Sequence, residues 1–249
     1  MSGHNKWAKI KRKKGVNDAR RGRLFTRLIK EMTIAARDGG GNPQGNPRLR
    51  LAIEKAQAAN MPAENIKRAI QRGTGELPGV IYEEVTYEGF GPGGVALMIE
   101  SVTDNKNRTV AEIRHILERF NGKFGALNSV SYMFHRKGII TIPRMNAAED
   151  DVMNIILDAG ADDMKTDEDS YQVITSPESF ERVRQALEKK NIKNEEAEIQ
   201  LVPENTVHVD GKEAEQLLRL LEALEDNDDI QHVFANFDMD EKLIASLNV

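Results

Sequence analysis

The hydrophobic pattern near the start of the chain is helical. From residue 18 to 37, apolar side chains recur every three or four positions, as on one face of an amphipathic helix. These residues are Leu24, Leu28, Met32 and Ala35. Basic side chains occupy a different side of this helix, and Ile34 falls among them. Three consecutive glycines from Gly39 end the predicted helix.

Two shorter helices complete this region. Pro47 suits the first position of a helix, and Asn46 before it is the expected N-cap, so a helix is predicted from Pro47 to about Asn60. Pro62 opens the next helix, which Gly73 ends. The pattern therefore predicts a small three-helix unit.

Beyond residue 76 the pattern changes to strands that alternate with helices. Strands are predicted at residues 81–89, 95–102, 129–135, 138–142, 162–166, 171–175, 196–202, 206–209 and 230–237. Helices are predicted at residues 109–120, 147–159, 177–190 and 212–225, with a last one after Asp240. Thr109 and Glu112 have the spacing of a capping box at the start of their helix.

The order of these elements predicts the domains. Residues 138–202 follow the β-α-β-β-α-β order of a ferredoxin-like unit. The elements on either side of it repeat that order when they are joined, and insertion at a hairpin tip is tolerated because the chain ends lie close together. The predicted fold is α+β. Its parts are a basic arm with a three-helix domain (1–76), a discontinuous ferredoxin-like α/β domain (77–137 and 203–249) and an inserted ferredoxin-like α/β domain (138–202).

The charge is divided unevenly between these parts. Residues 1–76 contain 18 lysines and arginines against 6 acidic residues, whereas residues 77–249 contain 17 against 34. The resulting net charges of +12 and −17 are hidden in the overall value of −5. Such asymmetry indicates a polyanionic partner. Residues 1–16 are too polar to fold alone, and we expect them to form an arm that becomes ordered on this partner.

The basic arm and the first helix supply the candidate phosphate contacts. Each phosphate that they neutralise releases counterions, so this region is predicted to bind DNA or RNA with marked salt dependence. Trp7 is expected either to stack on a base or sugar or to pack the arm onto the helices. The candidate residues are Lys6, Trp7, Lys9, Lys11, Arg12, Lys13, Lys14, Arg20, Arg23, Arg27 and Lys30.

Two loops after the helical unit have alternative interpretations. Residues 89–94 match a dinucleotide-binding glycine pattern, but a strand follows instead of the helix that such a site needs, so a hairpin turn is favoured. Residues 104–109 precede a helix, and Lys106 and Arg108 are secondary candidates for phosphate contact there. A capped loop that bonds its own backbone is the favoured interpretation.

Little in the sequence indicates catalysis. The chain has no cysteine, no secretory signal, no apolar run long enough to span a membrane and no histidine pair with zinc-helix spacing. Its acidic clusters, such as residues 226–229, lack the spacing of a calcium loop and are predicted to be solvated surface. We therefore predict a cytoplasmic protein without cofactor, metal, membrane contact or small-molecule substrate.

Several ordered segments carry a family resemblance. They are Gly3–Trp7 with Ile10–Lys14, Arg21–Phe25, Asn46–Arg50, Ala59–Pro62, Tyr87–Val95 and Thr103–Thr109. With these segments the chain resembles the YebC family, which comprises PmpR-like transcriptional regulators and mitochondrial translational activators, over nearly its whole length. The resemblance implies one helical and two α/β domains, and a cytoplasmic regulator that is not an enzyme.

The resemblance also implies two functional hypotheses. Some members of the family are described as DNA-binding transcriptional regulators, and others as ribosome-associated factors that help translation, including through proline-rich stretches. The first hypothesis is that the protein binds DNA; without an evident helix-turn-helix pattern, we predict weak base specificity. The alternative is that its partner is ribosomal or messenger RNA and the ribosome. Phosphate attraction alone does not separate the two.

Overall fold

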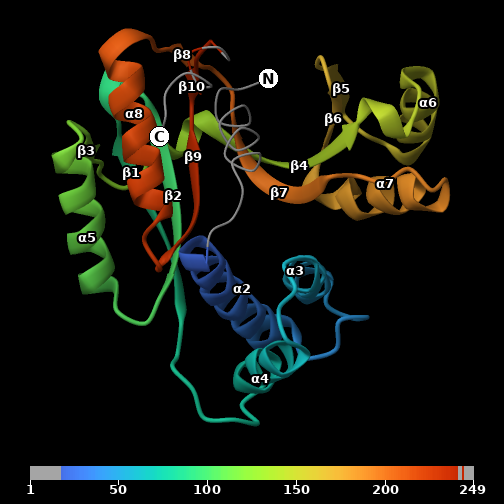
Figure 1. Ribbon diagram of the computed structural model, residues 1–249, viewed down its shortest axis with the longest axis horizontal. Coiled ribbons are helices and arrows are strands. Elements are labelled where there is room, and N and C mark those ends of the chain that lie inside the picture. The colour runs from blue at the N-terminus through green and yellow to red at the C-terminus, as the bar shows by residue number, and fades with distance from the viewer. Residues whose placement is uncertain (1–17, 241–242, 244–249) are drawn as a thin grey trace.

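The computed structural model describes the backbone of residues 18–240 and 243 and the side chains from Arg21 onward (Figure 1). The predicted arm over residues 1–16 and most of the predicted helix after Asp240 lie outside the described residues. The α+β class is confirmed, since the described part of the chain contains seven α-helices and two four-stranded antiparallel sheets.

Three helices form the N-terminal unit, as the periodicity predicts. They are α2 (Asp18–Gly39), α3 (Pro47–Ala58) and α4 (Ala63–Gly73). Their apolar faces share one core, which includes Leu28, Met32, Ala35, Leu49, Ala52, Ala56, Ile66 and Ala69. Asn46 is the N-cap of α3: its Oδ1 accepts a hydrogen bond from Leu49 N (3.1 Å), and its Nδ2 donates to Ala35 O (2.7 Å) and Gly40 O (2.9 Å). One buried amide therefore fixes the turn between α2 and α3.

The first sheet unit combines four strands and two helices. The strands, in the order β3-β1-β2-β9, are β3 (Lys123–Phe124), β1 (Glu83–Phe90), β2 (Ala96–Thr103) and β9 (Ile230–Ala235). Helices α5 (Lys106–Arg119) and α8 (Gly211–Glu225) cover one face of this sheet (Figure 1). The core between them contains Leu97, Ile99, Ile113, Leu117, Leu217 and Leu221.

In this sheet β1 lies beside β2. Strand β8 (Val207–His208), at the position of the strand predicted over residues 206–209, lies outside this sheet and pairs in parallel with β10 (Phe237–Asp238). β1 and β2 pair along their whole length and are joined by the short turn η1 (Pro92–Gly94). A hairpin closed by so few residues costs less loop entropy than pairing with a distant segment. The glycine pattern is thus a turn, as expected.

The predicted strand at residues 129–135 also differs. Its first part forms a loop and the short 3₁₀ helix η2 (Ser131–Met133). The buried carboxylate of Glu88 accepts hydrogen bonds from the backbone N–H groups of Asn128 (2.6 Å), Val130 (2.7 Å) and Ser131 (3.0 Å). Burial alone would raise the pKa of Glu88, but these bonds lower it. Backbone groups engaged by a side chain do not pair with a neighbouring strand.

The second sheet unit has the strand order predicted for residues 138–202. Its strands, in the order β5-β6-β4-β7, are β5 (Asp163–Thr166), β6 (Ser170–Thr175), β4 (Phe134–Pro143) and β7 (Glu196–Pro203). Helices α6 (Glu149–Ala159) and α7 (Pro177–Lys189) share a core with them that includes Ile140, Ile156, Val173 and Val183.

Two strands connect the sheet units. β4 pairs with β7 from Phe134 to Thr141, whereas β6 joins β4 only from Gly138 onward. The first residues of β4 and their β7 partners thus form a two-stranded ribbon between the two sheets (Figure 1). The predicted boundary at residue 138 falls inside β4, which replaces the separate strands predicted at 129–135 and 138–142.

Candidate nucleic-acid interface

The basic face of α2 packs against the first sheet unit. We define the α2 stripe as Arg23, Arg27, Lys30, Ile34 and Arg37, which follow one another at intervals of three or four residues. The side chain of Lys30 is buried, and its Nζ donates hydrogen bonds to Val102 O (3.1 Å), Asp228 O (2.8 Å) and Asp229 Oδ1 (2.8 Å). Ile34 is fully buried. This explains why an apolar residue interrupts the basic face.

Asp229 is the centre of this contact. Its second carboxylate oxygen accepts hydrogen bonds from Arg108 (2.7 Å), Thr109 (2.8 Å) and Thr103 (3.2 Å). Burial of the carboxyl group would raise its pKa, but the hydrogen bonds from Lys30, Arg108 and Thr109 outweigh burial and lower the pKa of Asp229 to about 2. The aspartate therefore stays charged and ties α2, β2 and the start of α5 together.

The other basic residues of the α2 stripe also face the chain itself. Arg23 forms an ion pair with Asp226 (3.0 Å). Arg27 is largely buried, and this burial lowers its pKa although Glu225 and Asp226 oppose the shift. Arg37 donates to the backbone oxygen of Tyr82 in the segment before β1. The stripe is thus an internal docking surface for the first sheet unit.

The structure places two of the predicted phosphate contacts beside acidic groups of the chain. Lys30 has three acceptors and is only 6% exposed, so its ammonium group is already paired in this conformation. Arg27 is largely buried beside the acidic residues 225–228, and its Nε and Nη2 have no hydrogen-bond partner among the described residues. Arg23 keeps 29% of its side chain exposed. The arm candidates Lys6, Trp7, Lys9, Lys11, Arg12, Lys13 and Lys14 lie outside the described residues, as does the side chain of Arg20.

Helix α3 directs its charges at both sheet units. Arg48 pairs with Glu84 of β1, Arg50 with Glu181 of α7 (2.7 Å) and Lys55 with Glu198 of β7 (2.6 Å). A reversed pair joins Glu54 of α3 to Arg184 of α7 (3.1 Å). Ion pairs that remain partly exposed contribute little stability each, about 0–1 kcal/mol. These pairs nevertheless leave the basic side chains of α3 with carboxylate partners inside the chain.

The loop over residues 103–109 binds an anion that belongs to the chain. Asn105 is the N-cap of α5 and accepts from Arg108 N (3.1 Å), so the helix starts at Lys106 and the predicted capping box of Thr109 and Glu112 is wrong. Arg108 and Thr109 bind the Asp229 carboxylate, and Lys106 pairs with Glu83. The expected capped loop is present. Its alternative was a phosphate site, but in the structure the Asp229 carboxylate is the anion that this loop binds.

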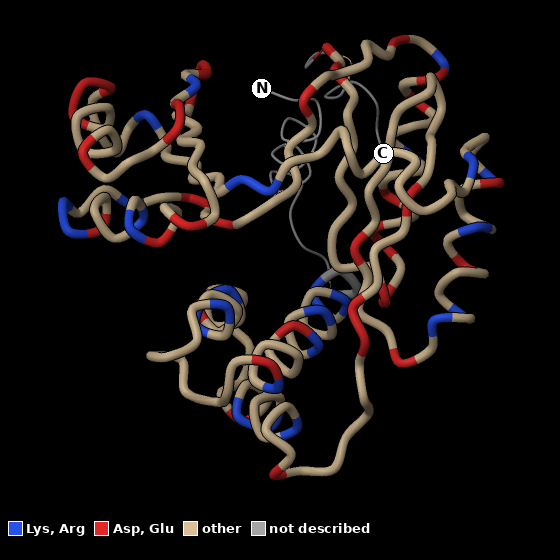
Figure 2. Tube along the Cα trace, turned by 180° about the vertical axis from the view of Figure 1, so that it is seen from behind, with Lys and Arg blue, Asp and Glu red and all other residues tan. Residues whose placement is uncertain are grey.

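Helix α4 differs from its neighbours because its cations point to solvent. Ile66 and Ala69 are buried in the helical core, while Lys67, Arg68 and Arg72 are exposed. Figure 2 marks in blue where lysines and arginines lie along the backbone of the N-terminal helices. Among the described residues, the ion pair found for these cations of α4 joins Arg68 to Glu64 of the same helix (3.1 Å). Helical periodicity could have identified these residues, since they alternate with the apolar positions of α4.

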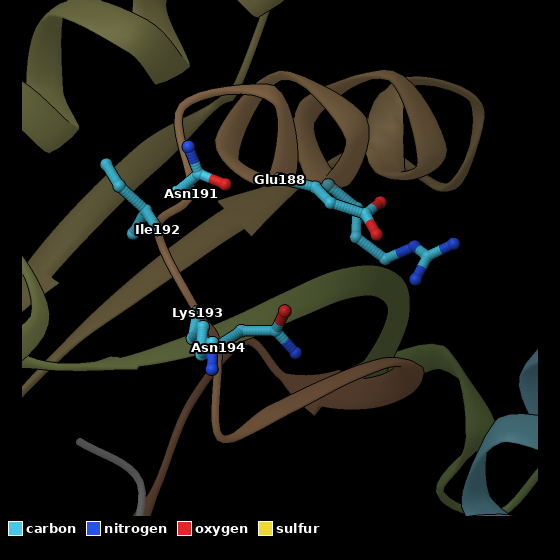
Figure 3. Close-up of a pocket in the computed structure, with 6 residues that line it drawn as sticks. Glu188, Asn191, Ile192, Lys193 and Asn194 are labelled. Atoms are coloured by element: carbon cyan, nitrogen blue, oxygen red, sulfur yellow. The ribbon is translucent and has the colours of Figure 1, made fainter.

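The described residues show no constellation typical of an enzyme. An open cavity of about 310 Å³ lies at the end of α7, where Glu188 faces Lys193 and Asn194 of the following loop (Figure 3). No group of three metal-ligating side chains is found in the described part of the chain. Within residues 18–240, no helix has the length and apolar character needed to span a bilayer.

Comparison with known proteins assigns the family. Models of the "TACO1/YebC protein N-terminal domain" and the "TACO1/YebC second and third domain" match residues 5–76 and 82–237. The chain belongs to the TACO1/YebC family. A relative named probable transcriptional regulatory protein from Chloroherpeton thalassium is 55% identical over 249 residues, covering 100% of both chains. Another of that name, from Desulfotalea psychrophila, is 54% identical over 248 residues, covering 99% of each chain.

A solved structure of another TACO1/YebC-like chain has the same architecture. The crystal structure of a conserved hypothetical protein from Aquifex aeolicus matches with a TM-score of 0.82 and 46% identity, covering 90% of this chain and 92% of that one. The resemblance to the YebC family is thus confirmed. At the level of the family, the names of the relatives identify this chain as a regulatory protein.

The Asp229 contact is the part of the site that the sequence did not predict. Residues 226–229 have the pattern of a solvated acidic turn, and nothing local distinguishes Asp229 from Asp226. Only the packing of α2 and α5 against the end of β9 buries one of these carboxylates. No sequence signal identifies it, because its partners lie 120 and 199 positions away.

Proposed function

We propose that this TACO1/YebC protein is a non-enzymatic, DNA-binding regulator of transcription that acts in the cytoplasm. The observation that carries the proposal is the net charge of +12 on residues 1–76, set against −17 on the rest of the chain. A positively charged module attached to acidic domains binds a polyanion through one part of its surface. The names of the relatives, which describe probable transcriptional regulators, support DNA as that polyanion.

The basic arm supplies the main phosphate contacts in this proposal. Seven of the candidate residues belong to the arm: Lys6, Trp7, Lys9, Lys11, Arg12, Lys13 and Lys14. Because Lys30 is engaged internally and Arg27 is largely buried, the first helix contributes mainly through its start, at Arg20 and Arg23. Binding through phosphates positions the protein without reading bases, so sequence selectivity is low.

The test is a titration of the full chain and of a variant that lacks residues 1–16. With fluorescently labelled duplex DNA, affinity should fall with rising salt, and removal of the arm should weaken binding and reduce the salt dependence by about one unit of slope for each lost phosphate contact. Unchanged affinity and slope in the truncated variant would show that the arm is not the site.

The translational alternative is tested with the same protein. The charge of residues 1–76 attracts RNA as it attracts DNA, so ribosome association has to be measured directly. The native protein should be absent from ribosomal fractions of a low-salt lysate after sedimentation if transcription is its function. Crosslinking to nucleic acid in cells, followed by sequencing of the attached strands, should return DNA; recovery of ribosomal or messenger RNA would replace the proposal by its alternative.

A further inference from the structure

Many cations of the helical unit are already paired within the chain. Five basic side chains of α2 and α3 pair with carboxylates of the two sheet units: Arg23, Lys30, Arg48, Arg50 and Lys55. These side chains already have an anion. A phosphate would have to displace a carboxylate that is held nearby by the fold.

Helix α4 has no such partners among the described residues. Lys67 and Arg72 are exposed and form no ion pair there, and Arg68 pairs only with Glu64, four positions earlier on the same exposed face. A pair of this kind, with both side chains more than half exposed, contributes little and yields readily to a competing anion. The α4 face, defined as Lys67, Arg68 and Arg72, is therefore a cationic surface of the helical unit that pairs with no carboxylate of the sheet units among the described residues.

The helix that carries this face is firmly seated. Thr33 Oγ1 of α2 donates to Ala69 O of α4 (3.3 Å), and a Cβ atom at Gly73 would lie 2.3 Å from Thr33 O. The two helices are thus in close backbone contact where Gly73 ends α4. Cations on a rigid helix lose less conformational freedom on binding than cations on a loop.

The connection between α3 and α4 adds a second, independent observation. Only residues 59–62 separate the two helices, with Asn60 at a positive φ of 57°. Connections of this length join the helices of many helical hairpins, helix-turn-helix motifs among them. The short turn therefore holds α4 close to α3, as the asparagine and proline in the sequence predict.

The cations are spread over the exposed part of α4. An α-helix turns by about 100° and rises about 1.5 Å per residue, so Arg68 and Arg72 lie about one turn and about 6 Å apart, and Lys67 lies about 100° around the helix from Arg68. From charge, exposure and rigidity, we infer that the α4 face binds the sugar–phosphate backbone of duplex DNA. This inference rests on the proposed function and adds a second contact surface to the arm.

The experiment compares two triple variants of the full-length protein. K67Q/R68Q/R72Q removes the α4 face, and the matched control K189Q/K190Q/K193Q removes three exposed lysines from the end of α7 and the loop after it. Affinity for a labelled DNA duplex is measured by fluorescence anisotropy over a series of salt concentrations. At about 100 mM salt, the α4 variant should bind at least about tenfold more weakly than the control, with a salt slope lower by about 2–3.

The outcomes separate the inference from the proposed function. If the wild-type protein fails to bind DNA, the proposed function fails; if it binds and both triple variants behave alike, only the α4 inference is overturned. Loss of affinity for duplex RNA with unchanged affinity for DNA would overturn DNA as the partner of this face. The double variant K67Q/R72Q keeps the Arg68–Glu64 pair, and should show a smaller loss in the same direction with unchanged thermal unfolding.

Discussion

Two basic helix faces of the N-terminal unit have opposite roles in the structure. The α2 stripe faces the first sheet unit, and at its centre Lys30 is buried against Asp229. The α4 face carries the same kinds of side chains and is exposed. Both look alike in the sequence, as cations at helical spacing beside an apolar face. The comparison teaches that the net charge of a region does not show which of its cations are free, because the partner of each cation depends on which helix faces an acidic surface of the same chain.

The largest expected effect separates a buried from an exposed lysine. Lys30→Met removes the ammonium group from the Asp229 carboxylate and leaves an uncompensated buried charge, which should destabilise the protein by about 3–5 kcal/mol. Lys67→Met on the α4 face should change stability by less than about 0.5 kcal/mol. Urea denaturation followed by circular dichroism measures both. Equal effects of the two substitutions would remove the distinction between the two faces.

The second effect concerns the pH dependence of the Asp229 contact. The pKa of this carboxyl is lowered from 3.8 to about 2 in the folded state. Its contribution of about 2–3 kcal/mol is therefore fully present above about pH 5 and is lost as the pH falls from about 4 to about 2.

The measurement is the unfolding free energy as a function of pH for the wild type, Asp229→Asn and the neighbouring exposed Asp228→Asn. The difference between wild type and Asp229→Asn should be constant near neutral pH and shrink in acid. Asp228→Asn should keep the acid-dependent loss seen in the wild type. A pH profile of Asp229→Asn parallel to that of the wild type would contradict the assignment.

A third test uses glycines of the two helices. A Cβ atom at Gly73 would overlap the backbone of α2, so Gly73→Ala should destabilise the helical unit by about 1–3 kcal/mol. Gly22 lies in α2 with nothing within 4 Å of a Cβ atom, so Gly22→Ala should stabilise by about 0.5–1 kcal/mol through helix propensity. Thermal unfolding of both variants should therefore shift in opposite directions. Two shifts of the same sign would show that α4 is not seated closely on α2.

The smallest effect concerns the exposed end of the α2 stripe. Arg23 and Asp226 form a partly exposed ion pair, with 29% and 45% of their side chains accessible. A double-mutant cycle of Arg23→Gln and Asp226→Asn should give a coupling energy of only about 0.2–1 kcal/mol, which decreases with added salt. A coupling energy as large as the loss of unfolding free energy in Lys30→Met would mean that the whole α2 stripe, and not Lys30 alone, stabilises the packing of α2 on the first sheet unit.

The strand predictions show where sequence patterns lose information. The strands predicted within residues 138–202 come together in one sheet, and they follow one another closely in the chain. The strands on either side of this unit do not reveal their partners in the sequence: β1 pairs with β2, whereas residues 207–208 pair with β10. Glu88 likewise converts part of a predicted strand into a loop through bonds to residues about 40 positions away.

Local information was sufficient for the three helices, the capping by Asn46, the glycine turn, the unequal charge and the family. Each depends on residues near one another in the chain or on composition, which the sequence displays directly. The tertiary structure alone decided which cations are available. Lys30 and Asp229 are 199 positions apart, so only the packing of α2 on the first sheet unit brings them to 2.8 Å. Burial makes Lys30 part of the packing between α2 and the first sheet unit. Helix α4 packs through its apolar side, so its cations are exposed to solvent.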